Sequence, residues 1–284
     1  MDIKKLAQEV FEIEAKEIAN LSSRLTADFE HAIHAILQSS GKLIVSGMGK
    51  SGIIGKKIAA TLASTGTPSF FLHPGEAYHG DLGMIEENDI VLLISNSGET
   101  DEVLKLIPFL KHQKNCTISM SGNEESTLAK NTKYHLNIAV DNEACPLFLA
   151  PTSSTTATLV MGDAIAVTLM KLRDFKEENF AKFHPGGSLG RRLLTTVGDV
   201  MRSQELPTTN SNATIKEVIQ CITEGKLGLV VVLEEHSIRG IITDGDIRRA
   251  MESREKEFFD LFAKDLMSLD PKLIDANEKL ITAS

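Results

Sequence analysis

The stretch from Leu43 to Lys57 constrains the fold more than any other part of the chain. Residues 43–45 form a short apolar run without polar alternation, which is typical of a strand buried on both faces. Glycines at 47, 49 and 52 follow at once, and apolar side chains then recur at helical spacing. A strand, a glycine turn and a helix start, in that order, aim free backbone N–H groups at an anion. The stretch therefore predicts an α/β unit with an anion-binding turn.

The same order of elements recurs along the first two thirds of the chain. Because strands that alternate with helices form a parallel sheet covered on both faces, we expect a three-layer α/β/α domain with a five-stranded parallel sheet. The expected strands are residues 43–45, 69–72, 89–94, 117–120 and 134–140, and the expected helices are residues 3–22, 27–39, 53–64, 100–110 and 126–130. A further long helix, capped by the hydroxyl-rich run of residues 151–156, is expected to extend to about residue 172. Residues 73–83 are too rich in glycine and polar groups for a regular element, so we expect a functional loop there.

From Val197 the pattern changes to a repeat. Gly198-Asp-Val-Met201 and Lys264-Asp-Leu-Met267 look like the starts of two copies of one α+β unit. The first copy continues through two strands to a helix from Asp244, whereas the second stops at Ser284, in a helix that we expect to begin near residue 276. An incomplete repeat lacks its own core, so we expect a truncated chain. The predicted domains are residues 1–194, 195–260 and 261–284.

Composition excludes some classes of protein. The formal net charge of -9 argues against nucleic acid as a partner, because binding to a phosphate backbone needs a basic face. Three cysteines without C-x-x-C spacing fit a reducing compartment. The apolar runs are too short to span a membrane, and the N-terminus has no apolar core of a signal peptide. We therefore expect a cytoplasmic protein with no membrane partner.

The glycine turn alone leaves the anion open. Gly47-Met-Gly-Lys-Ser-Gly52 satisfies the dinucleotide pattern G-x-G-x-x-G, but Glu76 lies in a glycine-rich loop rather than at the strand end where a ribose-binding acid stands. A phosphate loop of the Walker A type also fails, because Ile44 occupies its first glycine position.

A second loop favours a phosphate monoester. Ser95-Asn96-Ser97-Gly98-Glu99-Thr100 follows the third strand and opens a helix. Its three hydroxyl groups and free backbone N–H groups can surround one phosphate, whereas a simple helix cap needs only one hydroxyl. The sequence therefore predicts a phosphate cradle built from two loops.

These loops and three further motifs carry a resemblance to a known family. Ser95–Thr100 is similar to the phosphosugar-binding signature of sugar isomerase (SIS) domains, and Gly47–Gly52 is similar to their first loop. The runs His73–Met84, Ala144–Ala157 and Phe183–Arg192, followed by CBS-type repeats, resemble arabinose-5-phosphate isomerases over nearly the whole chain. The incomplete second CBS repeat departs from that pattern.

The resemblance implies interconversion of D-ribulose 5-phosphate and D-arabinose 5-phosphate through a cis-enediol, which supplies Kdo for lipopolysaccharide or capsule. The reaction needs a base, a proton shuttle and stabilisation of an oxyanion, and it requires no cofactor. The catalytic residues carried over by motif are Lys50, Glu102, Glu143 and His184. The substrate-binding residues are Ser51, Gly66, Thr67, His79, Ser95, Asn96, Ser97 and Thr100.

Glu143 is our choice of enediol base, because the Cys-Pro-Leu run behind it predicts a partly desolvated carboxylate with a raised pKa. His184 would open the sugar ring or relay protons. Lys50 would offset phosphate or enediolate charge, and Glu102 would mainly position Lys50. Without the resemblance, each of the four also fits an ordinary structural role.

Further expectations concern metals and partners. His73 and His79, six residues apart in one loop, could also bind zinc, but two histidines are too few for a closed site. The resemblance implies zinc there as an inhibitor rather than a cofactor, with His73 as the expected ligand. Cys145 is left out because isomerisation needs no nucleophile. SIS proteins resemble one another in forming dimers or tetramers with shared active sites, so a homotetramer, or at least a dimer, is expected. Thr243-Asp244-Gly-Asp246 either holds a nucleotide or sugar-nucleotide effector or caps a helix.

Two alternatives of other classes stay open at this point. SIS domains also occur in transcription regulators that sense sugar phosphates, but the first 40 residues and the net charge show neither a helix-turn-helix nor a basic face. Another SIS enzyme, a hexulose phosphate isomerase or a sugar-phosphate lyase, is disfavoured by the His-Pro-Gly-Gly and Ala-Cys-Pro runs.

Overall fold

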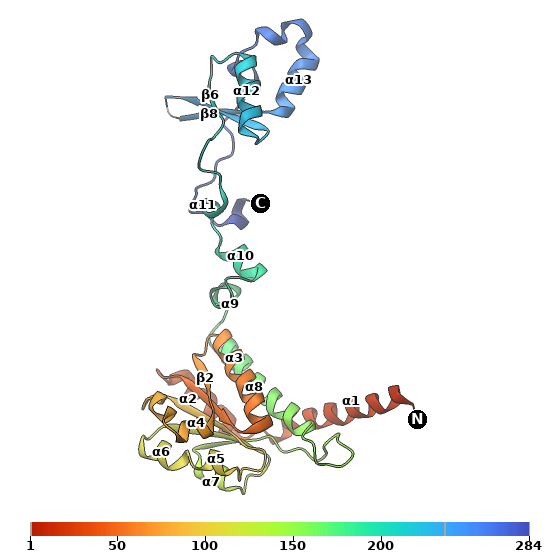
Figure 1. Ribbon diagram of the computed structural model, residues 1–284, viewed down its shortest axis with the longest axis vertical. Coiled ribbons are helices and arrows are strands. Elements are labelled where there is room, and N and C mark those ends of the chain that lie inside the picture. The colour runs from red at the N-terminus through yellow and green to blue at the C-terminus, as the bar shows by residue number, and fades with distance from the viewer. Residues whose placement is uncertain (1, 236, 284) are drawn as a thin grey trace. The chain divides into compact units, whose positions relative to one another are not determined.

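The computed structural model of the protein describes residues 2–235 and 237–283. They form two compact units, which we call unit 1 (up to Gly190) and unit 2 (from Arg191). Figure 1 shows the elements of both units. The three-part division predicted from the sequence, with ends at residues 194 and 260, stays a prediction.

Unit 1 is built around a parallel sheet of five strands in the order β2-β1-β3-β4-β5. All four neighbouring pairs run parallel, which confirms the predicted five-stranded sheet. The strands are β1 (Leu43–Gly47), β2 (Ser69–Leu72), β3 (Ile90–Ile94), β4 (Cys116–Ser121) and β5 (Tyr134–Asn137).

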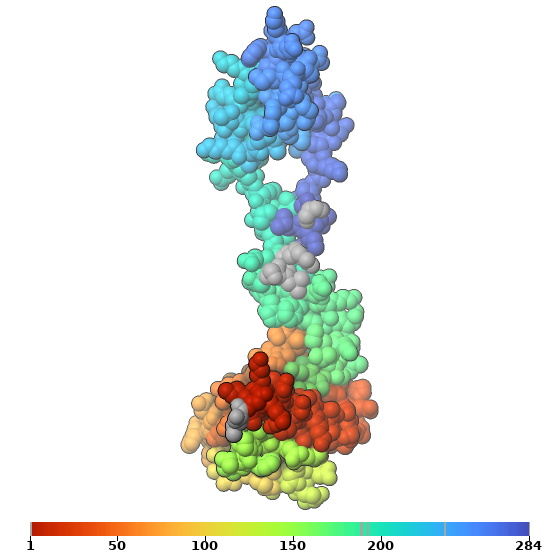
Figure 2. All heavy atoms as spheres, turned by 90° about the vertical axis from the view of Figure 1, so that its right-hand side faces the viewer, coloured from red at the N-terminus to blue at the C-terminus, as the bar shows by residue number. Residues whose placement is uncertain are grey.

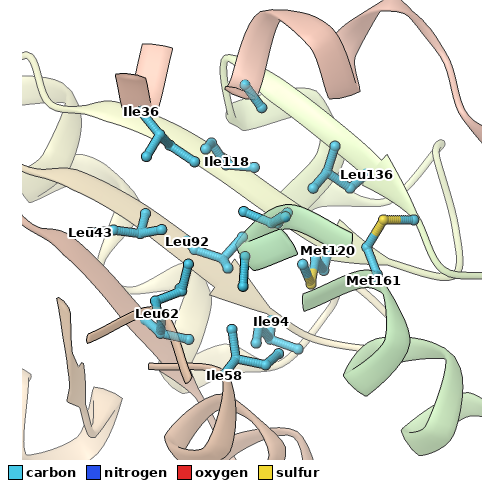
Figure 3. Close-up of a cluster of buried hydrophobic side chains, with 14 of the residues drawn as sticks. Ile36, Leu43, Ile58, Leu62, Leu92, Ile94, Ile118, Met120, Leu136 and Met161 are labelled. Carbon is cyan, nitrogen blue, oxygen red and sulfur yellow. The ribbon is translucent and has the colours of Figure 1, made fainter. Parts of the chain in front are cut away.

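Helices cover both faces of this sheet and complete the predicted α/β/α layers. Because side chains alternate along a strand, Val45 enters a core cluster with α2, α3 and α8, whereas Ile44 enters a second cluster with α4, α5, α6 and α7. Figure 3 shows the first cluster, in which Ile58 and Met161 meet Leu92, Ile94 and Met120. The helices of unit 1 are α1 (Ile3–Asn20), α2 (Ala27–Gln38), α3 (Gly49–Ser64), α4 (Pro74–Tyr78), α5 (Asp101–Leu104), α6 (Ile107–His112), α7 (Thr127–Asn131), α8 (Ser153–Leu172) and α9 (Glu177–Phe183), with 3₁₀ turns at Leu21–Arg24 and Asp81–Met84. A further helix, α10 (Ser188–Leu194), contains the boundary between the two units.

Two local predictions were wrong. The single helix expected over residues 100–110 is broken into α5 and α6, because Pro108 has no N–H to donate to Leu104 and its ring crowds that carbonyl. The segment 73–83, expected to be irregular, contains α4 and the 3₁₀ turn at Asp81–Met84. Pro74 stands at the first helical position of α4, where its missing N–H costs nothing.

α8 is the central helix of one face of unit 1. It is the one described helix that is long and apolar enough to span a membrane by length and composition. Its side chains Met161, Ile165 and Leu169 are buried in the first core cluster, against the sheet. α8 is therefore used here as a core helix.

Gly162 sets the close approach of α8 to α3. A Cβ atom at Gly162 would lie 2.4 Å from Cγ1 of Ile58, a side chain with no exposed surface. We expect Gly162→Ala to destabilise the protein, because overpacking costs about 1–3 kcal/mol and the gain in helix propensity returns only about 1 kcal/mol. Urea unfolding measures the difference, with Gly83→Ala as the control, since a Cβ at Gly83 meets nothing within 4 Å. Equal midpoints for the two variants would contradict the tight crossing.

Unit 2 is a small α+β unit with a mixed sheet in the order β6-β7-β8-β9, as expected for a CBS-type repeat. β6 and β7 are parallel, while β8 is antiparallel to both β7 and β9. Its elements are α11 (Val197–Val200), β6 (Thr208–Asn210), α12 (Ile215–Gly225), β7 (Leu229–Glu234), β8 (Ser237–Thr243), α13 (Asp244–Arg254), α14 (Ala263–Leu266) and β9 (Ser268–Leu269), with 3₁₀ turns at Glu255–Asp260 and Leu280–Ala283.

The helix expected from residue 276 is not formed as predicted. Residues 276–279 form a turn and an isolated β-bridge, and only the 3₁₀ turn at Leu280–Ala283 is helical. The carbonyls of Ala276 and Glu278 accept hydrogen bonds from the N–H groups of Gly198 and Val197, so they are not free for helical hydrogen bonds.

The start of α13 is closed by a reciprocal capping box. Thr243 Oγ1 donates to Asp246 Oδ2 at 2.7 Å, and the N–H of Thr243 donates to the same oxygen at 2.8 Å. The capping interpretation of this motif therefore holds.

Candidate active site

The sheet order marks where unit 1 can bind a ligand. After β1 the chain continues into α3, which covers one face of the sheet. After the neighbouring strand β3 it continues into α5, which covers the other face. Such a topological switch point opens a crevice at the carboxyl ends of the strands, where ligands of doubly wound α/β folds bind. A cavity of about 450 Å³ lies beside both connecting loops. The predicted site residues that line it are Lys50, Ser51, Asn96, Ser97, Thr100 and Glu143.

The first loop is shaped by two of its glycines. Gly49 opens α3 with a φ of +57°, which only glycine adopts readily. A Cβ at Gly52 would lie 2.5 Å from the carbonyl oxygen of Gly47, so the helix can pack this close to the strand end only without a side chain there. Lys50 and Ser51 lie between these glycines and reach the cavity. Lys50 is exposed and belongs to none of the ion pairs among the described residues.

The second loop is held by its own hydroxyl groups. Ser95 is buried, and its Oγ lies 2.8 Å from Thr100 Oγ1 and accepts a hydrogen bond from the N–H of Gly98 at 3.0 Å. Ser95 does not line the cavity, whereas Asn96 and Ser97 are exposed toward it. The sequence predicted that the hydroxyl groups of Ser95, Ser97 and Thr100 surround the phosphate, and the structure instead uses Ser95 to shape the loop that presents the other two.

Glu143 caps the long helix α8. Its Oε2 accepts hydrogen bonds from the N–H of Thr152 at 2.6 Å, from Thr152 Oγ1 at 2.8 Å and from the N–H of Ser154 at 3.4 Å. The sequence assigned that capping role to the hydroxyl-rich run before α8, but the side chain of Thr152 makes no cap of its own. A carboxylate from a preceding loop therefore satisfies the free N–H groups of the first turn of α8.

The predicted rise in the pKa of Glu143 is wrong. Desolvation does raise the pKa of this carboxyl, but the groups of Ser154 and Thr152 that face it lower the pKa by more, so that it lies below its ordinary value of 4.5. The prediction considered the apolar residues that follow Glu143 and missed the helix N-terminus in front of it. Glu143 is consequently ionised at neutral pH and able to accept a proton.

Several predicted residues lie outside the cavity. Gly66 and Thr67 precede β2, so they lie at the amino ends of the strands, whereas the cavity lies at the carboxyl ends. Arg173 donates hydrogen bonds there to the Gly66 carbonyl at 3.1 Å and to Thr67 Oγ1 at 2.5 Å. Glu102 lies half-buried in α5, and no contact in the described part of the chain joins it to Lys50. His184 ends α9, where its ring stacks on Phe180 at 3.9 Å.

The two loop histidines flank α4. His73 precedes the helix at the carboxyl end of β2, and its Nδ1 is buried without a hydrogen-bond partner among the described residues. His79 follows the helix and is exposed. Within the part of the chain that the structure describes, no group of three His, Cys, Asp or Glu side chains is placed to hold a metal ion.

Sequence reasoning missed one wall of the cavity. Phe148 and Leu149 line it from the loop after Glu143, and they are 68% and 81% exposed. Ser154, Thr155 and Thr158 line it from α8. The available signal was the three-residue apolar run from Leu147 to Leu149 in a segment with no regular structure, because such a run is exposed at a cost unless something covers it.

Comparisons with known proteins agree with this geometry. The family model of the SIS domain matches residues 36–168, and that of the CBS domain matches residues 197–253. The arabinose 5-phosphate isomerase KdsD of Yersinia pestis is 54% identical over 89% of this chain and 77% of its own length. The arabinose 5-phosphate isomerase KpsF of Escherichia coli is 48% identical over 95% of this chain and 85% of its own.

A solved structure of an E. coli CFT073 protein in complex with arabinose 5-phosphate is also similar, at 42% identity with a TM-score of 0.63, over 65% of this chain and 100% of that one. The sheet, the two loops and the SIS match together define a SIS-domain protein that carries a CBS-type unit. At the identity and coverage found, the chain belongs to the arabinose 5-phosphate isomerase family.

Proposed function

We propose that this chain is an aldose–ketose isomerase that interconverts D-ribulose 5-phosphate and D-arabinose 5-phosphate. One observation carries the proposal: a cation, a hydroxyl-bearing loop and an ionised carboxylate line the same cavity at the switch point of the sheet. The first two suit a phosphate monoester, and the carboxylate suits removal of a proton next to a carbonyl. The family membership supports the same reaction.

The two loops bind the phosphate group of the substrate in this proposal. Lys50 supplies positive charge, and Ser51, Asn96, Ser97 and Thr100 supply hydrogen-bonding groups from the same two loops. Holding the phosphate fixes the distant C1 and C2 atoms, so that binding energy from a non-reacting group lowers the barrier of the reacting one.

Glu143 acts at the other end of the substrate as the enediol base. Its carboxylate takes the C1 proton of the ketose to form the cis-enediol and returns a proton to C2 to give the aldose. Thr152 and Ser154 hold only Oε2 in the contacts that the structure shows, which leaves Oε1 for the substrate. No oxidation or reduction by an outside group occurs, so the reaction requires no cofactor.

His184 reaches this site from another subunit in our proposal. It lies outside the cavity of its own unit, and the exposed run from Leu147 to Leu149 at the cavity gives a second subunit an apolar surface to cover. A homotetramer, or at least a dimer, with shared active sites accounts for both features. His184 would then open the sugar ring or relay protons between the two oxygens.

The remaining functional assignments are also proposals. The reaction supplies Kdo biosynthesis for lipopolysaccharide or capsule in the cytoplasm. Zinc at His73 inhibits the enzyme, and His79 contacts the substrate. A nucleotide or sugar-nucleotide effector for the CBS-type unit stays a prediction, because the residues expected to bind it form the cap of α13.

Incubation with ribulose 5-phosphate, followed by NMR, tests the reaction. We expect arabinose 5-phosphate to accumulate to an equilibrium mixture that is also reached from the aldose. In deuterium oxide, label incorporated at C2 of arabinose 5-phosphate would indicate proton transfer by a base that exchanges with solvent. Tight binding of either sugar phosphate without turnover would contradict the proposal and favour a sugar-phosphate sensor.

A further inference from the structure

A buried carboxylate on α1 holds the segment that carries Glu143. Glu17 is only 1% exposed, although it is charged and lies on a helix whose other residues are mostly exposed. Its Oε2 accepts a hydrogen bond from the N–H of Asp141 at 2.8 Å, and its Oε1 accepts one from the N–H of Asn142 at 3.1 Å. These are the two residues immediately before Glu143.

The geometry requires a carboxylate at this position. Two successive backbone N–H groups point at two different oxygens, so both oxygens must be acceptors. Glutamine has one acceptor oxygen, and its NH₂ group would face one of the N–H donors. A buried donor that loses its acceptor costs about 1–3 kcal/mol, which the segment can avoid only by moving away.

Further contacts tie α1 to both sides of Glu143. Arg24, which ends the 3₁₀ turn after α1, pairs with Asp141 at 2.9 Å. Glu14 lies one turn before Glu17 and accepts a hydrogen bond from Thr156 Oγ1 at 2.8 Å, in the first turns of α8. α8 is also the helix whose N-terminus receives the Glu143 carboxylate. Figure 2 views unit 1 from the side on which α1, in dark red, faces the viewer.

We propose that Glu17 is a positioning residue for the reaction: it fixes the backbone at residues 141–142 and thereby holds the carboxylate of Glu143 against α8 and toward the substrate. The inference rests on the proposed function, in which Glu143 is the base. Glu17 lies outside the cavity and touches neither substrate nor the reacting atoms, so its effect must pass through Glu143.

The test is a double-mutant cycle measured by NMR turnover of ribulose 5-phosphate. We expect Glu17→Gln to lower kcat by about 10- to 100-fold, since a displacement of about 1 Å can cost 10²-fold, with KM within about twofold because the phosphate loops are untouched. Glu12→Gln, an exposed change on the same helix, should leave both unchanged. In a Glu143→Gln background, Glu17→Gln should have no further effect on kcat, because residues that act as a unit are not additive.

The outcomes separate this inference from the proposed function. If the two reductions in kcat multiply in the double variant, or if Glu17→Gln changes KM and leaves kcat unchanged, the positioning role of Glu17 is overturned. Absence of turnover by the unmodified chain would instead count against the proposed reaction. If Glu17→Gln does not fold, Arg24→Gln replaces it in the test, because loss of the ion pair with Asp141 loosens the same segment at residues 141–142. We then expect a smaller loss in kcat that disappears in the Glu143→Gln background, and a loss that persists there would overturn the inference.

Discussion

Glu143→Gln is expected to lower kcat by about 10²–10⁴, the contribution typical of a positioned general base. The amide cannot take the C1 proton, whereas its carbonyl oxygen can still accept the hydrogen bonds that Thr152 and Ser154 give to Oε2. The cap of α8 is therefore kept, and we expect the unfolding midpoint to change little. KM should also change little, because Lys50 and the two loops still hold the phosphate. Steady-state turnover measured by NMR gives both constants.

Glu124→Gln serves as the matched control, since Glu124 is exposed and does not line the cavity. Near-normal turnover by Glu143→Gln would move the role of base to another carboxylate, and Glu102→Gln is the next variant to measure. The pH profile of the unmodified enzyme adds a second check. Because the pKa of Glu143 is lowered from 4.5, more than half of this carboxyl group is still ionised at pH 4.5. Loss of kcat/KM through protonation of this group should therefore be centred below pH 4.5. A separate change near pH 6 is expected from the substrate, because the second pKa of a phosphate monoester is about 6.

The strands and layers of unit 1 were predictable because their signal is local. The strands β1, β2 and β3 contain apolar runs that can be recognised without knowledge of their neighbours. Ile44 and Val45 are both apolar because the sheet is buried on both faces. The single helix predicted over residues 100–110 is interrupted because of one residue, Pro108. Proline disfavours the interior of a helix, but the prediction gave more weight to the apolar residues at helical spacing on either side of it.

Within the site, the sequence predicted the residues that line the cavity from two short loops and missed those whose role depends on distant partners. Lys50 and Ser97 follow strands that parallel order brings together, so their meeting could be derived. The pKa of Glu143 could not, because it depends on Thr152, whose N–H is directed at that carboxylate only in the folded chain. Glu17 is separated from the segment it holds by more than a hundred residues, and in the sequence it is one acid among many on an amphipathic helix.

The different role of Ser95 among the hydroxyl groups of its loop could not be predicted for the same reason, because it depends on contacts made only in the folded chain. A run of serine and threonine in the sequence does not distinguish a hydroxyl that faces a ligand from one that faces its own backbone. Both Ser95 and Ser97 accept a hydrogen bond from a nearby backbone N–H, so the difference is decided by burial: Ser95 is buried and Ser97 is exposed. Variation at Ser95 should therefore act on the shape of the loop, whereas Ser97 and Lys50 line the cavity and can act on the substrate directly.

Lys50→Met is expected to lower kcat/KM by about 10²–10³, the range found when one preorganised electrostatic group is removed from an active site. Lys50 is the one cationic side chain among the residues that line the described cavity, so no neighbour there can replace its charge. Methionine keeps most of the volume of the side chain and preserves α3, since both residues are good helix formers. Lys57→Met is the control, because Lys57 lies on the same helix but pairs with Asp163 outside the cavity.

Turnover of D-ribulose, which lacks the phosphate, distinguishes the two negative charges that Lys50 can offset, that of the phosphate and that of the enediolate. If Lys50 holds the phosphate, Lys50→Met should raise the KM for ribulose 5-phosphate, while its slow turnover of D-ribulose should equal that of the unmodified enzyme. If Lys50 instead stabilises the enediolate, kcat should fall for both substrates by the same factor, because the reacting carbons are identical in the two. Since Lys50 shares the first loop with Ser51 and faces the cavity together with Ser97, we expect the first result. Unchanged kcat/KM for ribulose 5-phosphate would contradict both roles and, with them, the assignment of this loop to the anion.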